Sequence, residues 1–210
     1  MTTERPIIFN DAMVLAILDG RKTQTRRIMK PQPPPVGANG GALTGIRESS
    51  LGYGFDATYR LDNPTYLGTC PFGVVGDRLW VREGMLRRYH MGVWRYRAGD
   101  AIVLPDGKNA PDAGAWAFHT KRDYCPSIHM PRWASRLTLE ITGIRVERVQ
   151  DISEADAIAA GAVVSDELTG CAEDLNGSHR AAFALAWNSI HGRGAWDRNA
   201  WVWVLGVRKV

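Results

Sequence analysis

The chain has 210 residues, of which 45% are hydrophobic and 23% are charged, so it can bury a sizeable core. This composition excludes a disordered or fibrous protein. The continuous apolar runs are far shorter than the ~20 residues needed to cross a bilayer, and no charged-then-apolar leader opens the chain. We therefore expect one domain over residues 1–210 that neither spans a membrane nor is secreted.

Cysteine usage and charge point to a compartment and to a class of partner. The three cysteines, Cys70, Cys125 and Cys171, form no CxxC pair, which favours a reducing compartment and a cytoplasmic location. The net charge of +4 hides an acidic segment, residues 146–180, with eight acidic and two basic side chains. The remaining chain is strongly basic, as in many nucleic-acid binders, although a basic, solvated surface gives the same count.

The first third of the chain predicts one helix, one strand and one insertion. Apolar residues recur at helical spacing over 11–19, with Asn10 as N-cap and Gly20 at the C-terminal end. Residues 21–28 alternate and predict a loop that passes into a strand. Residues 31–68 contain a Pro-rich run and seven glycines, so we expect a long irregular insertion.

The middle of the chain predicts strands on either side of a second insertion. Residues 79–83 and 93–97 alternate in the manner of short strands, the latter within a loop-like segment at about 85–125. The clearest strand pattern covers residues 136–149, where Gly143 shifts the phase and suggests a bulge.

The last third predicts two helices and a buried strand. Ser153 can cap a short helix over 154–160, and a second helix is expected over 180–190. Residues 201–205 are apolar on both faces, which is typical of a central strand. Short strands with a few helices around them indicate a small β-barrel of α+β class with two long loop insertions.

The segment after the first helix carries the densest cluster of chemical groups. Lys22 offers a compact ammonium group, and Thr25 a weak nucleophile or a hydrogen-bond donor to phosphate. The neighbouring Arg21, Arg26 and Arg27 add guanidinium groups that could line a cleft and bind nucleic acid. The alternative is a solvated basic turn.

A second candidate surface combines arginines with aromatic residues, the usual pairing for single-stranded nucleic acid. The same residue types also serve as packing residues at the entrance to a strand, and the sequence leaves both interpretations open. The candidates here are Arg82, His129, Arg132, Trp133 and Arg136.

Metal and cofactor chemistry find no support in the sequence. The five histidines are scattered without HxxxH spacing, and the chain lacks the glycine-rich phosphate loop, the dinucleotide fingerprint and the serine elbow. We expect no metal site and no cofactor.

Four segments together resemble a known family. They are Gly-Arg-Lys-Thr-Gln-Thr-Arg-Arg at 20–27, Gly-Asp-Arg-Leu-Trp-Val-Arg-Glu at 76–83, His-Met-Pro-Arg-Trp-Ala-Ser-Arg at 129–136 and Ser-Glu-Ala-Asp-Ala at 153–157. Their order along the chain resembles the ASCH domain of the PUA-like superfamily, and most closely its longer relatives in phages and prophages. The resemblance covers about two thirds of the chain, outside the two insertions. It implies a PUA-like β-barrel flanked by short helices.

The resemblance also implies a site. A small ASCH enzyme that deacylates N4-acetylcytidine uses a lysine, a threonine and a glutamate; the first two match Lys22 and Thr25. The glutamate falls near Ala160, which can neither take nor give a proton. In order of preference, Glu83, Glu154 and Asp156 are the carboxylates that could replace it. We therefore regard Lys22, Thr25 and Glu83 as the candidate catalytic set.

Three functions follow as hypotheses. The first is binding of RNA or a modified nucleobase in a basic cleft of Lys22, Thr25, Arg26 and Glu83, with DNA as an alternative polymer. The second is hydrolysis, by an amidohydrolase acting on acylated cytidine or by a ribonuclease. The third is a phage accessory protein that acts through protein contacts. The sequence does not indicate an oligomeric state.

Overall fold

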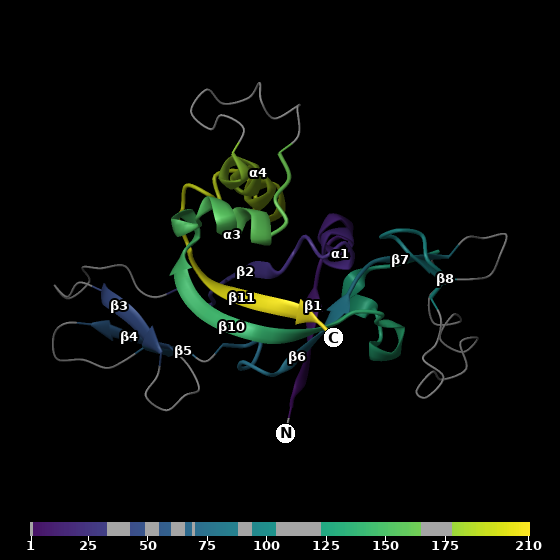
Figure 1. Ribbon diagram of the computed structural model, residues 1–210, viewed down its shortest axis with the longest axis horizontal. Helices are drawn as coiled ribbons and strands as arrows, with labels where there is room; N and C mark the ends of the chain where they lie inside the picture. Colours follow the sequence, from purple (N-terminus) through teal and green to yellow (C-terminus); the bar gives the residue numbers. More distant parts are fainter. Residues whose placement is uncertain are drawn as a thin grey trace. The chain divides into compact units, whose positions relative to one another are not determined.

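The computed structural model (Figure 1) divides the chain into two compact units, each described here by itself. Unit 1 comprises Met1–Arg21, Asp77–Glu140 and Arg208–Val210, and unit 2 comprises Lys22–Gly76 and Ile141–Val207. Within them, the structure describes residues 2–32, 43–48, 55–59, 66–68, 70–87, 94–103, 123–164 and 178–210.

The expected first helix is confirmed in unit 1 as α1, Asp11–Leu18. The side chain of Asn10 accepts a hydrogen bond of 2.9 Å from the backbone N–H of Met13, as an N-cap does. Gly20 has a φ of +73°, the left-handed conformation that ends a helix at low cost only in glycine. The helix buries Val14, Ala16 and Ile17.

Unit 1 contains a sheet with both parallel and antiparallel strand pairs. Its strand β1, Glu4–Ile8, runs parallel to β6, Arg78–Arg82, which confirms the strand expected at 79–83. On its other side β6 pairs antiparallel with the first residues of β10, Thr138–Arg148. Leu79, Val81 and Leu139 are almost fully buried, as the alternating sequence pattern predicts.

The second insertion contains the strand expected at 93–97, and some of its other described residues, expected to be loop, also form strands. Its described residues form a three-stranded antiparallel sheet in the order β8-β7-β9, made of Met85–Arg87 (β7), Trp94–Tyr96 (β8) and Tyr124–Cys125 (β9). Met85, Trp94, Tyr96 and Cys125 pack into a buried cluster with Met130 and Ala134. Burial of these apolar side chains favours strands over loops here. The rest of the insertion lies outside the described residues.

Two short 3-10 helices follow in unit 1, η1 at Ser127–His129 and η2 at Arg132–Ala134. They carry the chain into β10, so the segment expected to bind nucleic acid is mostly helical turn. Ala134, at the end of η2, is buried, and its carbonyl accepts a 2.7 Å hydrogen bond from the hydroxyl of Tyr96.

In unit 2 the strand order is β10-β11-β2, with β11 at Trp201–Lys209 and β2 at Gln24–Ile28. The prediction of a central strand at the C-terminal end is confirmed, because β11 has a neighbour on both sides and buries Val202 through Leu205. β2 runs antiparallel to β11 and pairs Thr25 with Leu205 and Arg26 with Val204. This register fixes the position of the basic segment.

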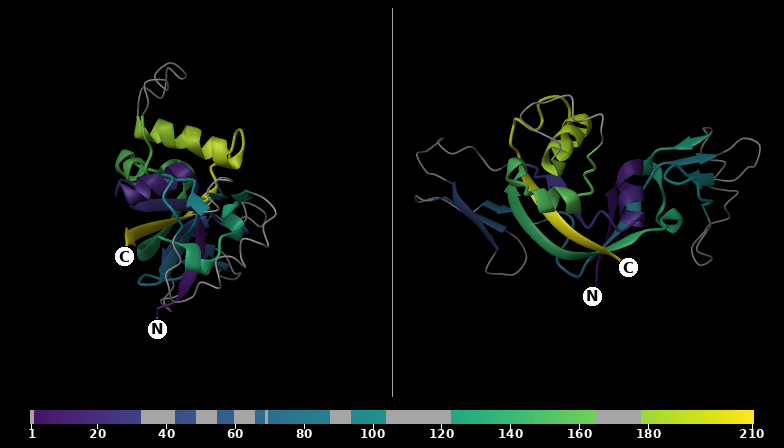
Figure 2. Two further views of the ribbon diagram at one scale, coloured as in Figure 1. Left: turned by 90° about the vertical axis from the view of Figure 1, so that its right-hand side faces the viewer. Right: turned by 45° about the horizontal axis from the view of Figure 1, so that its top comes forward.

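Helices cover one face of this sheet in unit 2, as both Figure 1 and Figure 2 show. They are the short η3, Val149–Asp151, then α3, Glu154–Ala159, and α4, His179–His191. Ser153 caps α3 by accepting a hydrogen bond from the N–H of Asp156, as expected. The helix expected over 180–190 is confirmed as α4, which buries Ala181, Ala184 and Trp187. Ile190, near its C-terminal end, is 47% exposed.

The first insertion also contains regular structure. Strands β3 (Leu43–Glu48), β4 (Phe55–Tyr59) and β5 (Tyr66–Gly68) form a three-stranded antiparallel sheet, so residues 31–68 are not irregular throughout. Local backbone pairing within hairpins overrides the glycine and proline content that suggested a loop. Other parts of this insertion lie outside the described residues.

The protein is thus of α+β class, with mixed sheets and few, short helices. In the described residues the strands pair into open sheets and do not close into a barrel. Over the same residues, no helix combines the length and apolar character that a membrane crossing requires.

Candidate nucleobase and nucleic-acid site

The segment that begins with Lys22 is attached to the C-terminal end of α3. The ammonium nitrogen of Lys22 donates to the backbone oxygens of Gln24 at 2.9 Å and of Ala160 at 2.6 Å. The N–H of Thr23 donates to the oxygen of Ala159 at 2.9 Å. The last carbonyls of a helix lack partners within the helix and carry its negative dipole end, so a lysine here stabilises α3.

Burial gives Lys22 unusual acid–base properties. Lys22 is only 5% exposed. Its burial lowers its pKa from 10.5 to about 7, and repulsion from Arg27 and Arg26 adds to this effect. The amine is therefore half neutral near pH 7. A neutral amine has two N–H bonds, the number that the Gln24 and Ala160 contacts require, so these contacts are compatible with both protonation states.

Strand alternation separates the candidate residues that follow. Thr25 and Arg27 project from one face of β2, and Gln24 and Arg26 from the other. Thr25 is 2% exposed, and burial lowers the pKa of Arg27 to about 10. The two guanidinium groups that adjoin in sequence therefore have different surroundings.

Arg26 is held by unit 2 itself. Its side chain is fully buried and donates to Glu147 Oε1 from Nε at 3.0 Å and from Nη2 at 2.6 Å. Arg26 also donates to the side-chain oxygen of Gln24 and lies 3.4 Å from Asp156. Its guanidinium carbon is 5.6 Å from the ring centroid of Phe183. A guanidinium group with these partners is a structural anchor between β2, β10 and α3.

Arg145 completes this polar network at its exposed edge. It donates to Glu147 at 3.0 Å and to Asp156 at 2.7 Å, and Gln24 donates to the other oxygen of Asp156 at 3.0 Å. Burial raises the pKa of Asp156, but the hydrogen bond from Gln24 and the charges of Arg145 and Arg26 bring it below its usual value. The positive charges of Arg26 and Arg145 and the negative charges of Glu147 and Asp156 thus balance.

The sequence analysis missed Gln24, Arg145 and Glu147. One signal was present, because Arg145 and Glu147 carry opposite charges two residues apart on an expected strand and so share a face. Nothing in the sequence indicated that Arg26 would meet them, since that contact joins residues 121 positions apart.

Glu83, the preferred carboxylate, belongs to unit 1 and is paired there. Arg136 donates to both of its oxygens, from Nε at 2.9 Å and from Nη2 at 2.8 Å, and also to the oxygen of Ala98. The guanidinium carbon of Arg136 lies 4.0 Å from the ring centroid of Tyr96. Burial raises the pKa of Glu83, and Arg136 counteracts part of this rise. Lys22 and Thr25, the other two members of the candidate catalytic set, belong to unit 2.

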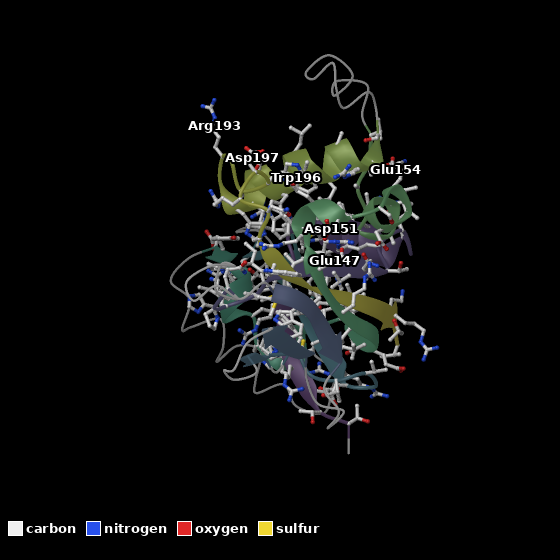
Figure 3. All side chains as sticks on the ribbon, turned by 90° about the vertical axis from the view of Figure 1, so that its left-hand side faces the viewer. Glu147, Asp151, Glu154, Arg193, Trp196 and Asp197 are labelled. Carbon is white, nitrogen blue, oxygen red and sulfur yellow. The ribbon has the colours of Figure 1, made fainter. Side chains whose placement is uncertain are left out.

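The other two carboxylates considered from sequence lie in unit 2 with partners of their own. Asp156 takes part in the network with Gln24 and Arg145. Glu154 accepts from the backbone N–H groups of His179 and Arg180, the first residues of α4. Figure 3 shows Glu154 at that end of the helix and Glu147 below it on β10. Glu154 thereby stabilises the positive end of the α4 dipole.

Two of the arginine candidates of unit 1, Arg82 and Arg132, lie beside Trp80. The guanidinium carbons of Arg82 and Arg132 lie 4.7 Å and 5.8 Å from its ring centroid, and Arg132 also pairs with Glu4 at 3.0 Å. Trp80 is only 8% exposed, so its ring is covered rather than open to a base. Trp133 packs against the cluster of Met85, and His129 is exposed.

Arg21, the remaining candidate, forms an exposed ion pair with Asp19 at 2.9 Å. In the described ranges, no group of three or more histidine, cysteine, aspartate or glutamate side chains is arranged to hold a metal ion. Comparison with known protein families, with curated proteins and with solved structures gave no match.

Proposed function

We propose that this chain is an ASCH-type protein of the PUA-like β-barrel class that binds RNA or a modified nucleobase at Lys22 and Thr25, in the cytoplasm of a bacterial or phage-infected cell. The observation that carries the proposal is the buried amine of Lys22, held by two backbone carbonyls beside Arg26 and Arg27. Such an amine is costly to charge in the empty protein.

A ligand oxygen can further stabilise the charged form of the amine. A base carbonyl or a phosphate oxygen that approaches the amine favours its ammonium form and raises its pKa. Binding therefore takes up a proton above pH 7, and affinity should rise as the pH falls from 9 to 6. Because Arg26 is neutralised by Glu147, we assign it to holding β2 in place.

The test is a binding titration of a labelled single-stranded RNA rich in cytidine, followed by fluorescence anisotropy at several pH values. We expect Lys22→Met to weaken binding at least tenfold at pH 7 and to abolish its pH dependence. Lys209→Met removes an exposed lysine with the same loss of charge and should change neither. Equal affinity and an unchanged pH profile for Lys22→Met would refute the proposal.

The pKa of Lys22 also favours a second candidate, an amidohydrolase acting on acylated cytidine. A neutral amine can accept a proton from a hydroxyl or a water as the amide carbonyl is attacked, and can return it to the departing nitrogen. Ala160 stands where the family's glutamate is expected, and Asp156 and Glu154 are engaged elsewhere in unit 2. Turnover is therefore the weaker candidate.

An assay of acetate release from N4-acetylcytidine distinguishes the binding protein from the amidohydrolase. Turnover by the wild type that is lost in Lys22→Ala would favour the hydrolase, and binding without turnover would favour the reader. If neither binding nor turnover is observed, both fail, and the third hypothesis, a phage accessory protein acting through protein contacts, gains weight.

A further inference from the structure

One face of β6 in unit 1 carries two arginines and a tryptophan. Strand alternation places Arg78, Trp80 and Arg82 on this face, because the fully buried Leu79 and Val81 occupy the other. Arg78 is exposed and Arg82 is partly exposed, so both ends of the row are open to solvent. We call Arg78, Trp80 and Arg82 the β6 row.

The two arginines of the β6 row differ from the other arginines of unit 1 because they lack an acidic partner. Within the described residues, neither Arg78 nor Arg82 forms an ion pair or a side-chain hydrogen bond. Every other described arginine of unit 1 pairs with a carboxylate, as Arg5 does with Asp77 at 2.8 Å. Two unpaired cations are therefore left on the same face of the same strand.

An aromatic ring holds Arg82 in place. The guanidinium carbon of Arg82 lies 4.7 Å from the ring centroid of Trp80, and that of Arg132 lies 5.8 Å from the same centroid. Glu4 fixes Arg132 through a 3.0 Å ion pair, and Trp80 is only 8% exposed, so the ring has little room to move. A cation–π contact of this kind orients a guanidinium group but uses none of its N–H donors.

The hydrogen-bond donors of Arg82 are consequently unused. Its Nε is buried and has no acceptor among the described residues, and an unsatisfied buried donor is unfavourable. Its terminal nitrogens are reached by solvent, so an anion can approach them. A guanidinium group offers donors only, in a fork that matches the oxygens of a phosphate or a carboxylate. The group that this position lacks is therefore an oxyanion.

The carboxylates nearest to the β6 row are already occupied. Glu4 on β1 and Glu140 on β10 lie directly across from Arg78 in the strand register. Both of them pair with other arginines instead, at 3.0 Å and 3.1 Å. At the other end of the row, the residue across from Arg82 on β1 is the uncharged Ile8. The charge of Arg82 is thus the less balanced of the two, and we expect it to make the stronger contact with an anion.

We propose that the β6 row binds the phosphate backbone of single-stranded RNA, with one phosphate on Arg82 and another on Arg78. This inference rests on the proposed RNA-binding function and assigns backbone contacts to unit 1, whereas the Lys22 site belongs to unit 2. Four residues of strand separate the Cα atoms of the two arginines by about 13 Å, a distance that suits two charges of a polyanion better than one small anion. Because Trp80 is covered, it positions Arg82 and does not stack on a base. Contacts of this kind orient RNA without reading its sequence.

The decisive experiment measures RNA affinity against salt concentration for the wild type and two double variants of equal charge. Each phosphate contact with a single strand contributes about 0.7 to the slope of log K against log salt, so Arg78→Met with Arg82→Met should flatten the slope by about 1.4. The control, Arg87→Met with Lys209→Met, removes two cations from the same unit and should leave the slope unchanged. A wild-type slope for the Arg78 and Arg82 variant, or an equal change in both variants, would overturn the proposal.

Two single variants keep the test valid if loss of Arg82 disturbs the packing of Trp80. Arg78 is exposed, so Arg78→Met should leave urea unfolding unchanged and flatten the slope by about 0.7. Arg82→Lys keeps the charge but lacks the guanidinium fork, so it should retain the slope and lower the affinity. An unchanged slope for Arg78→Met, or wild-type affinity for Arg82→Lys, contradicts the assignment of that arginine to a phosphate.

The NMR signal of the Arg82 Nε–H group tests the contact directly. This N–H is buried and should exchange slowly with water, and its signal is assigned by its absence in Arg82→Lys. A uridine hexamer should shift the signal. If inorganic phosphate shifts it but the hexamer does not, the site takes free phosphate, and the RNA assignment is wrong. A shift with polyglutamate alone would indicate an acidic protein partner and also overturns the assignment, as does no shift with any probe.

The Lys22 variant distinguishes failure of this inference from failure of the proposed function. If Lys22→Met binds RNA as the wild type does but the Arg78 and Arg82 variant has a flatter slope, the β6 row stands and the Lys22 site fails. If Lys22→Met loses affinity and pH dependence while the Arg78 and Arg82 variant keeps the wild-type slope, the Lys22 site stands and the β6 row fails.

Discussion

Replacement of Arg136 by methionine is the perturbation whose magnitude the structure defines best. The Glu83 side chain is 1% exposed, and both of its oxygens accept from Arg136. Methionine fills much of the same volume but leaves a buried carboxylate without its cation. Removing one partner of a buried ion pair typically costs about 3–5 kcal/mol, because the remaining charge is uncompensated. For a chain of this size that corresponds to a melting temperature lower by on the order of 10 °C.

The pH dependence identifies the carboxylate as the cause. Burial already raises the pKa of Glu83, and without Arg136 it rises further. Between the pKa of the unfolded chain and that of the folded variant, the folded state binds more protons, so stability falls as the pH rises. The deficit at pH 7 should therefore shrink toward pH 5, with a slope of up to about 1.4 kcal/mol per pH unit.

Urea unfolding of Arg136→Met at pH 5, 6, 7 and 8 measures this effect. Adding Glu83→Gln removes the stranded charge and should recover most of the loss. Arg132→Met is the matched control, because the pair of Arg132 with Glu4 is exposed on both sides and should contribute less than about 1 kcal/mol. A deficit no larger than that of Arg132→Met, or one independent of pH, would refute the reasoning.

Three further changes have expected outcomes. Between pH 7 and 10 the unfolded chain keeps the Lys22 proton that the folded protein has lost, so Lys22 should make the free energy of unfolding of the wild type increase with pH. Urea unfolding of Lys22→Met should not show this contribution. Gly206→Ala places a Cβ 2.9 Å from Thr142 Oγ1 and should lower the free energy of unfolding by about 1–3 kcal/mol, with partial recovery when Thr142→Ala is added. Ser153→Ala removes the 3.1 Å cap on the N–H of Asp156 and should cost about 1 kcal/mol, measured by thermal denaturation.

Local patterns in the sequence determined several elements of the fold. The helix at 11–18 begins at Asn10 and ends before Gly20 because both residues act on the backbone beside them. Apolar residues on both faces at 201–205 predicted the central strand, which extends to Lys209 in the structure. From the sequence, burial of Lys22 was only a condition for catalysis by its amine. The contact between Lys22 and Ala160 could not be derived from the sequence.

The tertiary structure decided how the charged side chains are used. Sequence adjacency grouped Arg26 with Arg27, yet β2 directs them to opposite faces, and Arg26 is neutralised by Glu147, 121 residues away. Likewise, Glu83 meets Arg136 across 53 residues. Ion pairs of this kind depend on strand register and helix placement, which are set by packing over the whole chain. Short motifs record which groups are present, but not which of them are already paired.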